Sequence, residues 1–286
     1  MKAGFIGLGL MGSRMAANIL EGGYELIIYN RTASKAEPLV KKGAELAQTA
    51  YQAAAGADVL FTMLSTPDSI KALALEPDGF LQGLQKNAIW IDCSTVNPSF
   101  TRWIAKTAAE KGIRFIDAPV SGTTIPAEKG ELTFFAGGNK NDIDEVMPLL
   151  NLMGKKIIYA GNTGMGTSFK MVVNLMLAAA MESFSEALTL GEALGLTREQ
   201  LFEVLIGGPV TAPMIAGKKN KITTNEYSAD FPLKWMHKDL QLVTDTAYEN
   251  MVPLPMTHII KEVFSLADKK GLGDLDFSAI YKFFSE

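Results

Sequence analysis

The chain contains few of the side chains on which disulfide-stabilised and metal-dependent proteins rely. Among its 286 residues there is one cysteine, Cys93, and there are two histidines, His237 and His258. A single cysteine excludes a disulfide within the chain and favours a reducing compartment, so we expect a cytoplasmic location. We interpret both histidines as surface or structural residues, and we predict no metal site.

An excess of positive charge and long apolar runs are also missing. Lys and Arg number 27 against 31 Asp and Glu, and no basic stripe stands out, so we expect no nucleic-acid partner. The most apolar later run, residues 171–181, contains Asn174 and is too short to cross a bilayer. The N-terminus shows no charged region followed by a cleavable apolar stretch. We therefore expect a soluble protein without a membrane segment.

Two different patterns divide the chain. The first half alternates short β-branched runs with amphipathic stretches, which predicts βαβ units and a parallel sheet covered on both faces. The second half has long helical patterns and no strand runs. The predicted strands are residues 3–6, 25–29, 59–64, 88–92, 114–117, 133–136 and 156–159. The predicted helices include residues 34–42, 98–111, 141–153, 165–194, 197–206, 233–249, 255–269 and 277–284.

The stretch "GFIGLGLMGSRMA" places three glycines between the first strand and the first helix. Gly7 permits a tight turn, Gly9 leaves room for a pyrophosphate, and Gly12 lets the helix pack closely on the strand. This context favours a dinucleotide site over an empty structural turn. We assign the turn to cofactor binding: Gly7, Leu8, Gly9, Leu10, Met11 and Gly12. The predicted fold is α/β, with a Rossmann domain over residues 1–162 and an all-helical domain over residues 163–286 that begins with a long interdomain helix.

The end of the second predicted strand selects the cofactor. An acidic residue there would bind the ribose 2′-hydroxyl of NAD, but the sequence reads "IIYNRTASKA". A guanidinium can bind a 2′-phosphate through two hydrogen bonds, so we predict NADP(H). The alternative is that the arginine is only a solvated loop charge. The residues assigned to this contact are Asn30, Arg31, Thr32 and Lys35.

Five motifs in order give the whole chain a resemblance to a known family. They are the glycine turn, "IDCSTV", "DAPVSG", "GMGTSFKMVVN" and "KDLQL". Together they resemble the β-hydroxyacid dehydrogenases, which include 3-hydroxyisobutyrate dehydrogenases, tartronate semialdehyde reductases and glyoxylate/succinic semialdehyde reductases. The resemblance implies an N-terminal Rossmann domain, a helical C-terminal domain and a site in the cleft between them.

The resemblance also implies roles for individual residues. Lys170 matches the family's catalytic lysine, and the helix start and the nicotinamide cation would lower its proton affinity. Asn174, one turn later on the same helix face, matches an amide that binds substrate or positions the lysine. Ser121, Gly122 and Thr123 match the segment that binds the substrate carboxylate.

Further positions match the family on the cofactor side. Thr95 corresponds to a position near the nicotinamide ribose and the substrate. Met63 and Leu64 correspond to residues that line the adenosine side. Lys238 and Asp239 match the late cofactor-side pair, and we expect Lys238 to approach the nicotinamide end.

One departure from the family pattern points to a branch. Thr123 replaces the second glycine of the usual Ser-Gly-Gly, and "PAEKG" follows it. This sequence, together with Phe231 and Trp235 in "FPLKWMHKDL", resembles the glyoxylate/succinic semialdehyde reductases more closely than the other branches. We assign Phe231 to substrate binding.

The favoured prediction is an NADPH-dependent reductase of small aldehyde acids that converts glyoxylate to glycolate and succinic semialdehyde to 4-hydroxybutyrate. One alternative is a dehydrogenase of 3-hydroxyisobutyrate or another β-hydroxy acid. Another is a non-catalytic dinucleotide-binding scaffold, which would have no chemical reason to keep Lys170. The apolar, methionine-rich helical half suggests an interface, and the family commonly forms homotetramers or homodimers.

Overall fold

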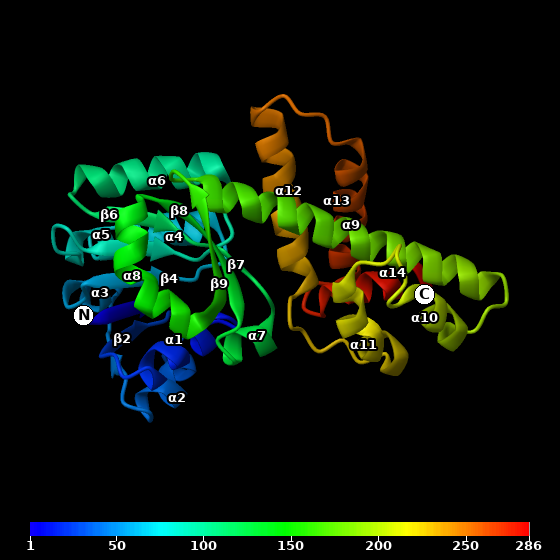
Figure 1. Ribbon diagram of the computed structural model, residues 1–286, viewed down its shortest axis with the longest axis horizontal. Coiled ribbons are helices and arrows are strands. Elements are labelled where there is room, and N and C mark those ends of the chain that lie inside the picture. Colours follow the sequence, from blue (N-terminus) through cyan, green and yellow to red (C-terminus); the bar gives the residue numbers. More distant parts are fainter. Residues whose placement is uncertain (286) are drawn as a thin grey trace. The chain divides into compact units, whose positions relative to one another are not determined.

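The computed structural model describes residues 1–285, which form two compact units (Figure 1). The first unit is Met1–Lys170, and the second begins at Met171 and includes the rest of the described chain. The helix α9 (Met165–Ala193) begins in the first unit and continues through the second.

A mixed sheet forms the centre of the first unit, and most of its strands are parallel. The order β3-β2-β1-β4-β5-β6 is parallel throughout and is the order of a dinucleotide-binding sheet. This confirms the predicted α/β Rossmann fold. The strands are β1 (Ala3–Ile6), β2 (Leu26–Tyr29), β3 (Glu45–Leu46), β4 (Val59–Thr62), β5 (Ile89–Asp92), β6 (Arg114–Asp117), β7 (Val120–Ser121), β8 (Leu132–Gly138) and β9 (Gly154–Gly161).

Helices cover both faces of this sheet. Side chains alternate between the faces along each strand, so Phe5 and Ile6 of β1 enter two different apolar cores. The core around Phe5 includes residues of α1 and α8, and the core around Ile6 includes residues of α3, α4, α5 and α6. The helices are α1 (Gly12–Glu21), α2 (Glu37–Val40), α3 (Ala50–Ala55), α4 (Pro67–Leu75), α5 (Phe80–Gly83), α6 (Pro98–Glu110), α7 (Thr124–Glu128) and α8 (Lys140–Met153).

The far edge of the sheet differs from the expected parallel pattern. Strand β8 runs antiparallel to β6 and β7, and β9 pairs with β8 in parallel. The sequence patterns also missed β3 and β7, because a strand of two residues has no periodicity of its own and forms only where a neighbour offers hydrogen bonds. The predicted helix over residues 34–42 is a 3-10 turn (Ala33–Ala36) followed by α2.

The second unit is built from helices, as predicted. Its elements are the rest of α9, α10 (Arg198–Leu205), a 3-10 turn (Pro213–Lys218), α11 (Lys219–Thr224), α12 (Leu233–Glu249), α13 (Pro255–Ala267), a π-helical turn (Asp268–Leu272), a 3-10 turn (Phe277–Ala279) and α14 (Ile280–Ser285). Most of their buried apolar residues form one core that includes Phe184, Phe264 and Phe277, and Met171, Leu242 and Val243 form a smaller cluster.

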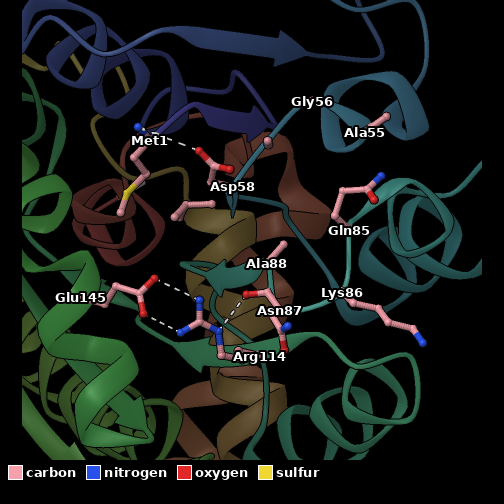
Figure 2. Close-up of a pocket in the computed structure, with 12 residues that line it drawn as sticks. Met1, Ala55, Gly56, Asp58, Gln85, Lys86, Asn87, Ala88, Arg114 and Glu145 are labelled. Carbon is pink, nitrogen blue, oxygen red and sulfur yellow. Dashed lines mark hydrogen bonds and ion pairs between the residues drawn. The ribbon is translucent and has the colours of Figure 1, made fainter.

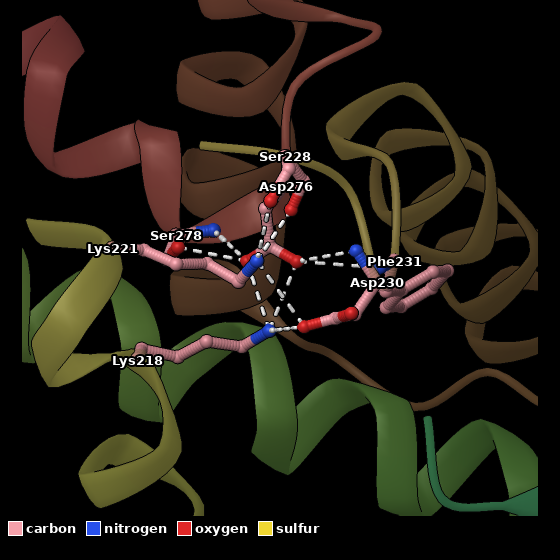
Figure 3. A network of polar contacts seen from close by, with 7 residues as sticks. All are labelled: Lys218, Lys221, Ser228, Asp230, Phe231, Asp276 and Ser278. Atoms are coloured by element: carbon pink, nitrogen blue, oxygen red, sulfur yellow. Dashed lines mark hydrogen bonds and ion pairs between the residues drawn. The ribbon is translucent and has the colours of Figure 1, made fainter. Parts of the chain in front are cut away.

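A buried ion-pair network fixes the segment that leads into α12 (Figure 3). Asp276 is fully buried and lies 2.9 Å from the ammonium of Lys218. The same carboxylate accepts the backbone N–H groups of Asp230, at 3.1 Å, and Phe231, at 3.3 Å. Lys221 pairs with Asp230 at 3.3 Å. Because α12 has no side-chain cap of its own, these contacts set where that helix begins.

By length and composition, α9 is apolar enough to cross a membrane. In the structure, 44% of the most apolar 18-residue stretch of α9 is buried within the protein. A core helix that packs inside a domain meets the same criteria, so this property alone is weak evidence for a membrane span.

Candidate active site

The glycine turn has the geometry that a bound dinucleotide requires. Gly7 has a φ of +99°, which disfavours any residue with a side chain. A Cβ on Gly12 would lie 1.9 Å from the Gly7 carbonyl oxygen, so α1 can approach β1 only because this residue is glycine. A Cβ on Gly9 would meet no atom within 4 Å and would project into open space. The structure therefore gives Gly7 and Gly12 their predicted backbone roles, and the approach of a pyrophosphate to Gly9 stays a prediction.

Asn30 connects the glycine turn to the loop after β2. Its Oδ1 accepts the backbone N–H of Leu8 at 2.9 Å, and its Nδ2 donates to the carbonyl oxygen of Thr32 at 2.9 Å. One side chain therefore fixes the turn expected to face the pyrophosphate and the loop expected to face the 2′-phosphate.

A cavity of about 300 Å³ lies beside this loop. Arg31 and Lys35 line it, and no carboxylate does so among its described lining residues. The remaining lining residues are Ile6, Gly7, Gly9, Tyr29, Asn30, Thr32, Met63, Leu64, Ser65, Ser69, Ala72 and Leu73. The cavity thus brings together eight of the fifteen predicted cofactor residues, and it combines an apolar wall with the two cationic side chains. Sequence reasoning missed the α4 residues Ser69 and Ala72, which carry no motif.

The other residues of the glycine turn lie elsewhere. Leu8 is buried beneath the turn, and Leu10 lines a more open groove along α1. Met11 occupies the N-cap position of α1.

A second hollow, of about 390 Å³, lies at the opposite end of the strands (Figure 2). Its arginine, Arg114, already pairs with Glu145 and Asp142, with an Arg114 Nη2 to Glu145 Oε1 distance of 3.0 Å. The guanidinium is therefore neutralised within the protein, and we assign no ligand to this hollow.

The segment predicted to bind the substrate carboxylate follows β6 directly. Ser121 is half-buried in β7, where it pairs with Thr133 of β8. Gly122 has a φ of +128°, and Thr123 is extended before α7. A side chain on Gly122 would be strained, which explains the glycine that closes "DAPVSG".

Thr95 lies in the loop after β5 (Ile89–Asp92). The preceding Ser94 accepts the backbone N–H of Leu64 through its hydroxyl at 2.9 Å. This contact ties the loop that carries Thr95 to the loop that carries Met63 and Leu64.

Lys170 and Asn174 are one turn apart on α9. Asn174 is 1% exposed and donates from Nδ2 to Oδ2 of Asp239 at 2.6 Å. The other carboxylate oxygen of Asp239 lies 2.8 Å from Nζ of Lys238. Among the described residues, Oδ1 of Asn174 is buried without a hydrogen-bond donor. Because a buried acceptor without a donor is costly, this oxygen is suited to a ligand that supplies one.

The contact between Asn174 and Asp239 was not foreseen. The sequence assigns Asp239 to the cofactor side with Lys238, whereas the structure pairs its carboxylate with the predicted substrate amide. The two residues are 65 positions apart and share no local pattern, so only the packing of α12 beside α9 brings them together.

Phe231 lies just before α12. Its ring packs against Phe277 with ring centroids 5.7 Å apart, and Asp276 holds its backbone N–H. Both the ring and the backbone of Phe231 are therefore held in place, and its assignment to substrate binding stays a prediction.

Comparisons with known proteins identify the family of this chain. Residues 2–161 match the NAD binding domain of 6-phosphogluconate dehydrogenase. Residues 164–284 match the domain described as NAD-binding of NADP-dependent 3-hydroxyisobutyrate dehydrogenase.

Three individual proteins illustrate the similarity. Glyoxylate/succinic semialdehyde reductase 1 of Arabidopsis thaliana is 36% identical over 280 residues, which cover 98% of this chain and 97% of the relative. The 2-(hydroxymethyl)glutarate dehydrogenase of Eubacterium barkeri is 36% identical over 283 residues, which cover 99% of this chain and 94% of the relative. A 3-hydroxyisobutyrate dehydrogenase of Mycobacterium tuberculosis, solved with L-serine, has a TM-score of 0.89 at 28% identity and covers 100% of this chain and 99% of that chain. The chain belongs to the β-hydroxyacid dehydrogenase family, and it is an NAD(P)-binding oxidoreductase that acts on the hydroxyl group of hydroxy acids.

Proposed function

We propose that the protein is an NADPH-dependent reductase of small aldehyde acids, with glyoxylate and succinic semialdehyde as substrates, and that it works in the cytoplasm. The observation that carries the cofactor assignment is that Arg31 and Lys35 line the cavity, whereas none of its described lining residues is a carboxylate. A 2′-phosphate would gain charge-assisted hydrogen bonds there. Support for the substrate class comes from the similarity to the plant glyoxylate/succinic semialdehyde reductase along nearly its full length.

The residues divide the chemistry between them. When bound, a nicotinamide cofactor would supply the hydride that a carbonyl reduction needs. The ammonium of Lys170 donates the proton to the carbonyl oxygen, where negative charge develops. Asn174, held by Asp239, positions Lys170 one turn earlier on the same helix face, and Ser121, Gly122 and Thr123 bind the substrate carboxylate.

A direct assay tests this function. Oxidation of NADPH is followed with glyoxylate, with succinic semialdehyde and without substrate, and the reverse reaction is followed with 3-hydroxyisobutyrate and NADP⁺. The proposal expects rapid turnover with at least one aldehyde acid. Turnover only with 3-hydroxyisobutyrate would make the protein a β-hydroxyacid dehydrogenase, the second candidate, which the similarity to the Mycobacterium tuberculosis structure favours. Cofactor binding without any turnover would favour a scaffold.

Ser121→Ala tests the proposed carboxylate-binding segment. The hydroxyl is expected to contact the substrate and not the cofactor, so the KM for the aldehyde acid should rise by about tenfold, as for the loss of one hydrogen bond to a charged group. The Kd of NADPH, measured by fluorescence, should stay unchanged. An equal loss in both constants would place Ser121 on the cofactor side.

We also propose that the protein is a homodimer or homotetramer. Apolar residues recur every three or four positions along α9 and are exposed, among them Val172 (63% exposed) and Met176 (62% exposed). A second copy would cover such a stripe. The double variant Val172→Lys/Met176→Lys should sediment as a smaller species than the wild type. Val40→Lys, which changes an exposed apolar residue of α2, should leave the sedimentation coefficient unchanged.

A further inference from the structure

Asp117, the last residue of β6, binds the first turn of the helix that carries Lys170. Its Oδ1 accepts the backbone N–H of Gly164 at 2.8 Å. Its Oδ2 accepts the backbone N–H of Thr167 at 2.8 Å and the Thr167 hydroxyl at 2.9 Å. The carboxylate is therefore a cap for α9 that comes from a strand 47 to 50 residues away in the sequence.

The backbone and side chains around the Asp117 carboxylate are closely packed. A Cβ on Gly166 would lie 2.1 Å from the Phe135 carbonyl oxygen and 2.9 Å from Oδ2 of Asp117. A Cβ on Gly137 would lie 2.7 Å from Oδ1 of Asp117. The hydroxyl of Thr101 on α6 lies 3.1 Å from that of Thr167. Two glycines and a threonine thus shape a closed pocket around one carboxylate, which is 1% exposed.

This contact lies next to the proposed proton donor. Lys170 follows Thr167 by three positions, so it lies on the neighbouring turn of the same side of α9. Side chains on a helix lean toward its N-terminus, which directs Lys170 back over the turn that Asp117 holds.

We propose that Asp117 is a positioning residue for Lys170: its carboxylate fixes the turn under the lysine and places a negative charge on the side toward which the lysine leans. The inference rests on the proposed function, in which Lys170 is the acid. The negative charge opposes the positive end of the α9 dipole, which would otherwise favour loss of the lysine's proton.

Asp117 carries this charge at neutral pH. Burial raises the pKa of its carboxyl to about 6, and the three donors from Gly164 and Thr167 oppose that rise by stabilising the ionised form. Two other charged groups face this region. Asp92 lies beside Asp117 in register on β5, and the Arg102 side chain of α6 packs against Gly164. The substitution below changes neither of them.

The test is the pH profile of kcat for Asp117→Asn, with the wild type, Lys170→Ala and Asp142→Asn measured in parallel. Asparagine keeps the size of the side chain but removes its charge. The pH at which kcat falls on the alkaline side should therefore decrease by about one unit. The kcat itself should fall by about 10- to 100-fold, because one donor of the turn then faces an NH₂ group. Asp142→Asn makes the same chemical change beside Arg114, at the opposite end of β6, and should leave the profile unchanged.

Thr167 supplies a second pair of variants in case Asp117→Asn does not fold. Thr167→Val removes the hydroxyl donor to Asp117 and keeps the charge, so kcat should fall while the alkaline limb stays in place. Thr167→Ser keeps the donor and should restore kcat. Equal kcat values for the valine and serine variants would overturn the positioning role.

The outcomes separate the inference from the proposed function. If Lys170→Ala is inactive and the alkaline limb of Asp117→Asn moves to lower pH, the results support both the proposed function and the positioning role of Asp117. If Lys170→Ala is inactive but Asp117→Asn keeps the alkaline limb of the wild type, the results overturn the role of Asp117 and leave the proposed function intact. An active Lys170→Ala would remove the proposed acid and the inference with it.

Discussion

Replacing Lys170 with alanine should lower kcat for the best aldehyde acid by about 10²- to 10⁴-fold or more, the usual contribution of a general acid. The reaction builds negative charge on the carbonyl oxygen, and an ammonium there both stabilises that charge and supplies the proton. The contribution therefore appears in the transition state, and NADPH binding should be largely retained. The measurement is kcat from initial rates, together with the Kd of NADPH and a circular dichroism spectrum to confirm folding.

Lys170→Met and Lys170→Arg sharpen this experiment. Methionine keeps much of the side-chain volume and should be as inactive as alanine. Arginine keeps the charge but barely releases its proton, so it should not restore full activity. In the wild type, reduction should weaken at high pH as Lys170 loses its proton. Near-normal turnover of Lys170→Ala would exclude this residue as the acid and direct attention to Lys238 or a bound water.

Arg31→Asp should shift the cofactor preference from NADPH toward NADH. The new carboxylate would repel the 2′-phosphate and could bind the ribose hydroxyl of NADH. The loss in NADPH binding should be about 1.5–3 kcal/mol, as for a charge-assisted hydrogen bond. The measurement is kcat/KM for both cofactors at a saturating concentration of the same aldehyde acid.

Lys41→Asp is the matched control for this variant. It introduces the same charge change on an exposed residue just after α2, outside the lining of the cavity. The ratio of kcat/KM for NADPH to that for NADH should stay at the wild-type value there. If Arg31→Asp also keeps the wild-type ratio, the assignment of Arg31 to the 2′-phosphate is wrong.

Local sequence patterns were sufficient for the parts of the fold that local physics determines. The β-branched runs predicted the bounds of β1, β2, β4, β5 and β6 to within two residues, and the glycine spacing predicted the turn after β1. Residues near one another in the sequence, such as Gly7, Gly9 and Gly12, need only one turn to act together. The resemblance to a family was needed to single out Lys170, because a lone lysine near a helix start is usually a solvated surface residue.

Contacts between distant segments were beyond these patterns. Asp117 and Thr167 are 50 positions apart, and Asn174 and Asp239 are 65 positions apart. Each pair forms only after strands and helices have packed, and the identity of one residue does not indicate which distant residue it will contact. The antiparallel course of β8 escaped prediction for the same reason, since its direction depends on the path of the chain through α7.

The two hydrogen bonds of Asn30 constrain how this protein can change its cofactor during evolution. An acidic residue at the end of the second strand is the usual device for NAD. Here Asn30→Asp would keep the acceptor for Leu8 but would turn a carboxylate oxygen toward the Thr32 carbonyl oxygen, where Nδ2 now donates. A change of Asn30 itself to the acidic residue typical of NAD enzymes would therefore loosen this loop. A change of cofactor preference is then expected to begin in the loop, at Arg31, while Asn30 is retained for its two structural hydrogen bonds.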